Sequence, residues 1–231
     1  YEKNSESSAN HLLDIFSKMI DFDFYREEEL TIMLKIVDEI KDKNDFYLDP
    51  ISHLFKLIAK ISRIKKEITP NYFQFAIDKF NEVNDEPSLL NTKVQLSFFL
   101  LSSFNQDKNK FQPVLPLIPD IVSVFPCYKL INKFFIEMKT FVDNNMDLMT
   151  EEILGAIISA LLRYLYYQSN ARSIFEFDPD LDNQLHEMFT QLLDLYCKNF
   201  KDEDTEELIN SLIPDHSSSI KCILSLEQFN H

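Results

Sequence analysis

Glycine occurs only once in this sequence of 231 residues, as Gly155. Phosphate-binding loops, dinucleotide-binding turns and two-residue hairpin turns all need glycine, because their backbones adopt conformations that a Cβ atom disfavours. The apolar fraction of 45% is nevertheless ample for a sizeable buried core. The sequence therefore excludes the glycine-dependent nucleotide sites and favours a folded chain built from elements without tight turns.

Apolar residues recur at spacings of three and four, which is the repeat of one face of an α-helix. Sustained alternation with a period of two, the pattern of a half-buried strand, is absent. The pattern predicts an all-α fold, and the helix from 150 to 168 is expected to be the most deeply buried. The clearest stripes are Leu12, Leu13, Phe16, Met19 and Ile20; Leu30, Met33, Leu34, Val37 and Ile40; Ile51, Leu54, Phe55, Ile58 and Ile61; and Leu130, Ile131, Phe134, Phe135, Met138, Phe141 and Val142.

Helix starts are marked by residues typical of N-terminal caps. Thr150 and Thr205 each precede two glutamates, which complement the positive end of a helix. A capping residue followed by proline at the first helical position occurs at Asp49–Pro50, Thr69–Pro70 and Asp178–Pro179. Together these signals predict helices that begin near residues 10, 26, 50, 70, 88, 111, 127, 150, 179, 205 and 217.

The predicted helix starts are regularly spaced. Alternate helices begin at 26, 70, 111 and 150, in steps of 44, 41 and 39 residues. A two-helix unit of about 40 residues is the period of HEAT and armadillo repeats. We therefore expect tandem antiparallel helix pairs in a single α-helical repeat domain over 1–231, as a fragment of a longer chain. A compact, non-repetitive helical bundle is the alternative.

One segment carries the resemblance most clearly. Residues 111–125, FQPVLPLIPDIVSVF, resemble the first helix of a HEAT repeat, and a short link at Pro126 and Cys127 leads into a second helix over 129–143. The aspartate between the helices and the early basic residue of many HEAT repeats are missing. The resemblance is to HEAT/armadillo-type proteins as a class, which include karyopherin-type transport receptors, and it implies a right-handed α-solenoid.

A basic cluster stands out in a chain whose net charge is −15. Lys56, Lys60 and Arg63 are spaced to share one face of the third helix, and Lys65 and Lys66 follow at its end. Lysine and arginine donate hydrogen bonds to carboxylate and phosphate groups. The cluster predicts a binding surface for an acidic protein or peptide, although a solvated helix face would explain it too. The overall charge argues against nucleic acid as a partner except through this cluster.

No motif indicates catalysis, a metal or a cofactor. The acidic run from Asp178 to Asp182 lacks the glycine and glutamate of a calcium loop. Adjacent Asp215, His216 and Ser217 cannot form a catalytic relay, because consecutive side chains diverge. The three cysteines are too far apart in sequence for a zinc motif, and the absence of a disulfide framework favours an intracellular, cytoplasmic or nuclear, protein. The longest apolar stretch, 153–167, is too short and interrupted to span a membrane.

These observations predict a non-enzymatic scaffold or adaptor that binds a partner segment on a helical-repeat surface. One alternative is a fragment of a karyopherin-like nuclear transport receptor. Another is an all-helical enzyme or effector whose site is assembled from distant residues. The aromatic groups at Phe22, Phe24 and Tyr25, at Phe98, Phe99 and Phe104, and at Tyr164, Tyr166 and Tyr167 are expected to lie mostly in the core.

Overall fold

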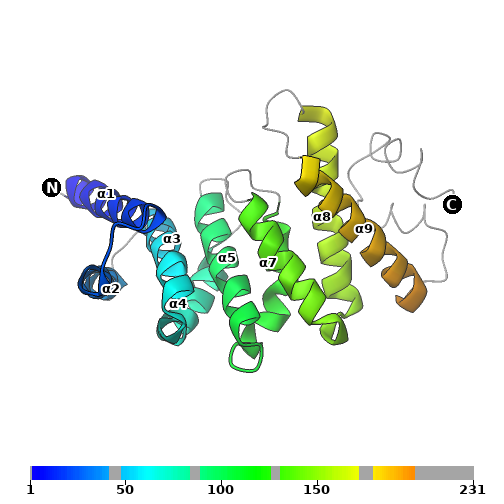
Figure 1. The fold of residues 1–231 in the computed structure, drawn as a ribbon, viewed down its shortest axis with the longest axis horizontal. Coiled ribbons are helices and arrows are strands. Elements are labelled where there is room, and N and C mark those ends of the chain that lie inside the picture. Colours follow the sequence, from blue (N-terminus) through cyan, green and yellow to red (C-terminus); the bar gives the residue numbers. More distant parts are fainter. Residues whose placement is uncertain (1, 42–47, 84–88, 126–130, 172–178, 201–231) are drawn as a thin grey trace. The chain divides into compact units, whose positions relative to one another are not determined.

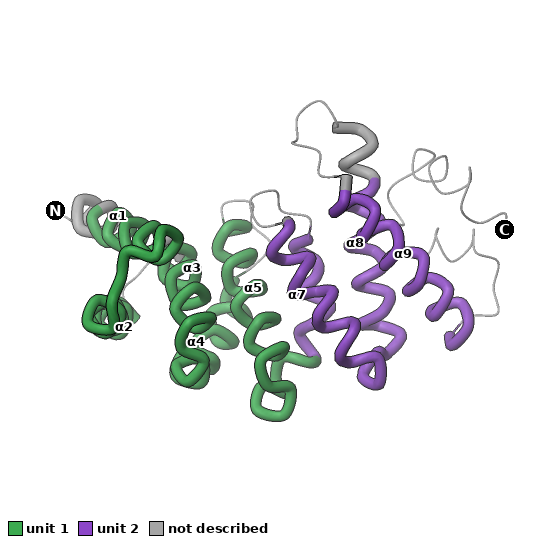
Figure 2. The backbone as a smooth tube through the Cα atoms, viewed as in Figure 1, with its two compact units in different colours: residues 1–115 green, residues 116–231 purple. Residues whose placement is uncertain are grey.

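The computed structural model describes residues 2–41, 48–83, 89–125, 131–171 and 179–200 (Figure 1). Every regular element in this part of the chain is helical, which confirms the predicted all-α fold class. The chain divides into two compact units, residues 1–115 and 116–231 (Figure 2). Each unit is described by itself below.

The first unit is built around helix α3 (Leu48–Ile64). α3 packs against α1 (Glu2–Asp21) and against α5 (Leu90–Gln106), and α5 in turn packs against α4 (Thr69–Glu82). α2 (Glu27–Lys41) also contacts α3, and the short 3₁₀ helix η1 (Lys66–Ile68) joins α3 to α4. α3 is therefore the element through which the helices of this unit are connected.

The core of the first unit is aromatic where α3, α4 and α5 meet. The Phe55 ring of α3 stacks on Phe75 of α4 at 5.6 Å and lies 5.4 Å from Phe99 of α5, measured between ring centroids. α5 is buried at every position from Val94 to Phe104. A helix that is buried on all sides must be covered by neighbours all round, so α5 is central to the packing of its unit.

The second unit is centred on α8 (Glu151–Ala171), which packs against α6 (Ile118–Ser123) and α9 (Pro179–Phe200). It also contains α7 (Ile131–Asn144) and the 3₁₀ helix η5 (Met146–Leu148). The Phe125 ring lies 6.0 Å from Phe134 and 5.8 Å from Tyr164 between centroids. These rings join the end of α6 to α7 and α8 through apolar contact.

Most predicted helix starts agree with the structure to within two residues, but two expectations are wrong. The first helix begins at Glu2 rather than near residue 10, because helix propagation continues through residues that carry no apolar stripe. Residues 111–125 do not form one α-helix: a 3₁₀ helix, η3 (Gln112–Leu117), precedes α6. Three prolines in this segment lack the N–H that an α-helix requires, and Pro116 lies inside η3. The start predicted near 127 and the helices predicted near 205 and 217 lie outside the described residues.

Two capping predictions have different outcomes. The amide of Ile153 donates to the Thr150 hydroxyl at 3.3 Å, so Thr150 caps α8 as predicted. Thr69 does not cap α4: the helix begins at Thr69 itself, and its hydroxyl donates to the Gln106 side chain at 3.0 Å. Thr69 instead ties α4 to the end of α5. Asp49 does not cap α3, because that helix begins at Leu48 and includes Asp49. Pro179 is the first residue of α9 as predicted, whereas Asp178 lies outside the described residues.

The deepest burial lies in a different helix from the one expected. α8 is mostly buried from Ile153 to Leu165, but Ala156, Ser159 and Arg163 are only half-buried. α5, by contrast, is buried without interruption from Val94 to Phe104. Its polar residues Ser97, Ser102 and Ser103 obscured this in the sequence, because a helix with polar positions is expected to face solvent with them.

Candidate partner-binding surface

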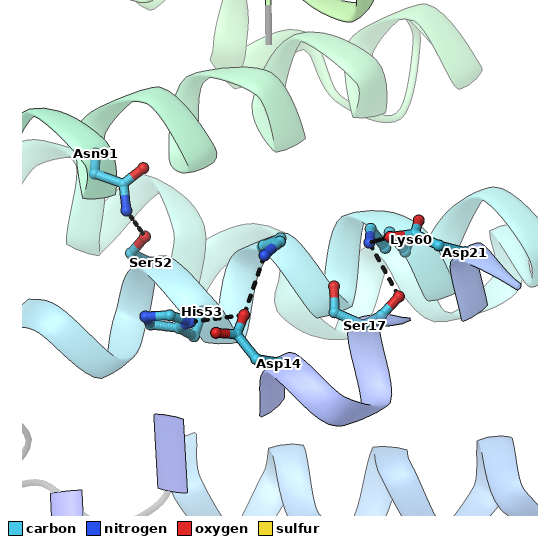
Figure 3. A network of polar contacts seen from close by, with 8 residues as sticks. Asp14, Ser17, Asp21, Ser52, His53, Lys60 and Asn91 are labelled. Carbon is cyan, nitrogen blue, oxygen red and sulfur yellow. Dashed lines mark hydrogen bonds and ion pairs between the residues drawn. The ribbon is translucent and has the colours of Figure 1, made fainter. Parts of the chain in front are cut away.

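Two of the predicted partner-binding lysines point from α3 towards α1 (Figure 3). The Lys56 ammonium donates to the Asp14 carboxylate at 3.0 Å. The Lys60 ammonium donates to the Asp21 carboxylate at 2.6 Å and to the Ser17 carbonyl at 3.0 Å. Both cations therefore fasten α1 to α3 in the folded chain.

The other three basic residues of the cluster point in different directions. Lys65 forms an ion pair with Glu27 at the start of α2. The Arg63 guanidinium lies 4.7 Å from the centroid of the Phe98 ring on α5, a cation–π geometry. Lys66 is exposed at η1. The structure thus directs four of the five residues into contacts with α1, α2 and α5, and the binding of the cluster to an acidic partner stays a prediction.

Asp14 is the centre of the polar contacts between α1 and α3. Besides Lys56, it contacts His53 Nδ1 at 3.1 Å (Figure 3). Partial burial acts to raise the pKa of Asp14, but the hydrogen bonds and charges of Lys56 and His53 outweigh burial and lower its pKa overall. The ionised form of this carboxyl is therefore favoured by the packing of α1 on α3. Elsewhere on α3, Asn91 donates to the Ser52 hydroxyl at 2.5 Å and links α3 to α5.

The turn between α1 and α2 has a defined backbone geometry. Asp23 has a φ of 55°, in the left-handed region. The amide of Phe24 donates to the Met19 carbonyl at 2.8 Å, and the amide of Asp23 donates to the Ile20 carbonyl at 3.2 Å. These two bonds around a left-handed residue make a Schellman motif, which satisfies the last carbonyl groups of α1.

The N-terminus of α2 is capped by a side chain of its own first turn. The Glu29 carboxylate accepts a hydrogen bond from the Arg26 amide at 2.8 Å and another from the Arg26 guanidinium at 2.9 Å. The first is the back-reaching half of a capping box, here without the usual serine or threonine. These hydrogen bonds lower the pKa of Glu29 and raise that of Arg26. The turn is therefore fixed at both of its ends.

Two aromatic side chains project from this turn. Phe22 and Phe24 are 66% and 72% exposed, and their ring centroids are 6.2 Å apart. The expectation that this aromatic group lies in the core is wrong for both residues, whereas Phe98, Phe99, Phe104 and Tyr164 are buried as expected. Sequence position could have indicated their exposure, since both phenylalanines follow the last residue of the apolar stripe of α1 and precede the acidic start of α2.

A second, open depression lies on the other unit, at the start of α8 and the end of α9. It is lined by Thr150, Glu151, Glu152, Gly155 and Tyr196. The Tyr196 hydroxyl donates to the Glu151 carboxylate at 3.0 Å, so the two helices are joined there. Acidic side chains at a helix start are explained by the helix dipole.

Comparisons with known proteins found no match from which the role of this surface could be inferred. No protein-family model, curated protein or solved structure matches the chain. Across the described ranges, histidine, cysteine and carboxylate side chains form no group of three or more that could hold a metal ion. Within the same ranges, no helix has both the length and the apolar character needed to cross a bilayer.

Proposed function

We propose that the protein is a non-enzymatic scaffold or adaptor that holds a segment of a partner protein on a surface of stacked helices. One observation carries this proposal. Nine large hydrophobic side chains are exposed in the described part of the chain, and four of them lie within residues 15–32: Ile15, Phe22, Phe24 and Ile32. Single exposed apolar residues are ordinary, but four of them within 18 residues of chain, on α1, α2 and the turn between them, favour an interaction site.

The packing order of the helices supports a repeat architecture as the finer description of the fold. In the first unit, α3 packs between α1 and α5, so every second helix is a neighbour. α2 and α4 meet as well, because the Tyr72 hydroxyl donates to Asp38 at 3.0 Å. Stacking of alternate helices is typical of HEAT and armadillo repeats, whose exposed faces bind extended partners. We therefore propose a HEAT/armadillo-like α-solenoid of tandem helix pairs.

The basic cluster remains a candidate binding site for an acidic partner, but three of its lysines already have acceptors within the chain. Lys56, Lys60 and Lys65 already donate to carboxylates of α1 and α2. An acidic partner segment would have to compete with Asp14, Asp21 and Glu27 for these ammonium groups. Such competition is expected to be weak at Lys60, which is only 16% exposed and donates to two acceptors.

Affinity purification from the native cell, followed by binding of the purified partner to the purified chain, tests the proposal. We expect a reproducible partner whose direct binding is measurable by calorimetry. Reversal of Lys56, Lys60 and Arg63 to glutamate then asks whether the basic cluster contributes, with Lys133→Glu on α7 as a control for charge reversal at one exposed lysine outside the cluster. If no enriched protein binds the purified chain directly, the scaffold proposal is wrong.

A further inference from the structure

The aromatic pair Phe22 and Phe24 is not explained by the packing of the fold. In a Schellman motif, the residue after the left-handed position usually packs back on the last turn of its helix. Phe24 occupies that position, yet its side chain is 72% exposed. Phe22 is also mostly exposed, and the two rings are tilted by 33° at a separation of 6.2 Å. Both rings are therefore available to another molecule.

The pair is held on a turn that cannot rearrange freely. Asp21, directly before the pair, forms an ion pair with Lys60 at 2.6 Å, and Glu27, just after the turn, forms one with Lys65. Lys60 lies near the end of α3 and Lys65 directly follows that helix, so the turn is tied to the same region on each side of the rings. A binding loop whose backbone is already held in place loses less conformational entropy on association.

The charges around the pair are mainly acidic. From Lys18 to Glu29 the chain carries five acidic residues, Asp21, Asp23, Glu27, Glu28 and Glu29, against two basic ones, Lys18 and Arg26. The ammonium groups of Lys60 and Lys65 approach from beneath and are only 16% and 18% exposed. The exposed side chains of Lys66 and Glu67, which follow Lys65 in the chain, carry opposite charges that cancel. Asp21, Glu27 and Glu29 are already paired with Lys60, Lys65 and Arg26, so the acidic excess that a partner meets is carried mainly by Asp23 and Glu28. This excess favours lysine or arginine on the partner's side.

We infer that Phe22 and Phe24 form an anchor for an amphipathic helix of another protein, one whose apolar stripe is flanked by basic residues. The spacing of the two rings supports a helix, because side chains three and four residues apart on a helix are separated by about 5–6 Å. Two successive apolar residues of such a stripe can contact the two rings, while flanking lysine or arginine meets the carboxylates. This inference rests on the proposed binding function and names the partner's chemistry.

The probe is a synthetic amphipathic helix made of leucine and lysine, compared with a peptide in which glutamate replaces every lysine. Binding is measured by fluorescence anisotropy, and the site is located from amide shifts in NMR spectra. For the natural chain we expect binding of the leucine–lysine peptide, shifts at residues 22–24, and loss of affinity with added salt. The variant F22S/F24S should lose at least about tenfold in affinity, as is typical for central aromatic anchors.

The matched control is Ile136→Ser, which removes a side chain that is 61% exposed on α7. It should bind the peptide as the natural chain does, and both variants should melt unchanged because the replaced side chains are not in the core. Equal affinity of F22S/F24S and the natural chain, no binding of the leucine–lysine peptide, or equal binding of the leucine–glutamate peptide would each overturn the inference. A dimer of the natural chain that F22S/F24S dissociates would overturn it as well, because a second copy would then cover the rings.

The same variant separates this inference from the proposed function. If the partner from the native cell binds F22S/F24S as tightly as the natural chain, the scaffold function stands and the anchor is wrong. If no direct partner exists and the peptide is not bound either, both are wrong.

Discussion

At the scale of single residues, capping and turn geometry account for details that helical periodicity does not predict. Asp23 adopts a left-handed conformation in a position where glycine is the usual residue. Aspartate tolerates this conformation better than most residues do, because its short side chain can bond locally. With a single glycine in the chain, the end of α1 relies on this tolerance.

Asp23→Gly should leave the free energy of unfolding unchanged or raise it by up to about 1 kcal/mol, because glycine has no Cβ to strain. Asp23→Val should lower it by about 1–2 kcal/mol, since a β-branched residue is poorly tolerated at positive φ. Urea denaturation measures both. The control Glu28→Val, at an exposed helical position, should cost less than Asp23→Val. A valine variant as stable as the glycine variant would show that the turn is not left-handed at this residue.

Asp14 gives a residue-level prediction of pH dependence. Its pKa in the folded chain is lower than the ordinary value of 3.8, so its contribution to stability is present above that value. That contribution is lost as the pH falls below 3.8 and through the lowered pKa. Asp14→Asn should therefore reduce stability near neutral pH and flatten the loss of stability in acid.

The control for this experiment is Asp143→Asn, which removes an exposed carboxylate paired with Lys139 inside α7. It should leave the acid dependence nearly unchanged, because exposed pairs within one helix contribute little. An Asp14→Asn variant with the same acid dependence as the natural chain would contradict the described contacts of Asp14.

At the scale of helices, the contact between α1 and α3 combines apolar and charged interactions. Leu13 is fully buried, whereas most of the α1 stripe is half-buried, so polar contacts complete the attachment. Lys60 donates to Asp21 and to the Ser17 carbonyl near the C-terminus of α1, where a cation also complements the helix dipole. The lysines that look like a free basic face in the sequence therefore contribute to the packing of α1.

Lys60→Met keeps the aliphatic stem but removes the charge and the donors. We expect the free energy of unfolding to fall by about 1 kcal/mol, the usual net value of a hydrogen bond, with a larger effect at low salt. Lys133→Met, at an exposed position of α7, is the control and should change stability by less than about 0.5 kcal/mol. Equal stability of the two variants would mean that Lys60 does not fasten α1.

Helix burial gives a second prediction at this scale. Leu100 of α5 and Leu161 of α8 are both fully buried, each in the central helix of its unit. Replacing either with alanine should cost about 2–5 kcal/mol, from lost apolar burial and the cavity left behind. Ile136→Ala, at a mostly exposed position, is the comparison and should cost far less. Chemical denaturation monitored by circular dichroism measures the free energy of unfolding of all three variants. A small loss of stability in Leu100→Ala would contradict the burial of α5.

The sequence was sufficient for the fold class and for most helix starts, because apolar spacing and caps such as Thr150 act locally. It was not sufficient where distant segments decide the outcome. The partners of Lys56 and Lys60 lie about 40 residues away on α1, a pairing that no local pattern encodes. Residues 111–125 resemble one HEAT helix in sequence, but three prolines without an N–H disfavour a continuous α-helix there, and a 3₁₀ helix precedes α6. The exposure of Phe22 and Phe24 depends on the turn geometry at Asp23 and could not be inferred from hydrophobicity.

At the scale of the whole molecule, the all-helical content of the described residues makes a simple spectroscopic prediction. The far-UV circular dichroism spectrum of the chain should be dominated by helix, with negligible strand. Strand content comparable to helix would contradict the fold. The net charge of −15 gives a second prediction: basic partners should bind faster at low salt, because the electrostatic field of an acidic protein attracts cations.

The proposed function places a protein-binding surface on α1, α2 and the turn between them. The most direct measurement is site-specific photocrosslinking in the native cell, with a photoreactive amino acid placed at Ile32 of α2 or at Ile136 of α7. Both side chains are exposed, so neither replacement disturbs the core. The account predicts a discrete crosslinked partner from position 32, identified by mass spectrometry, and none from position 136. No crosslink at position 32, or the same crosslinks from both positions, would contradict it.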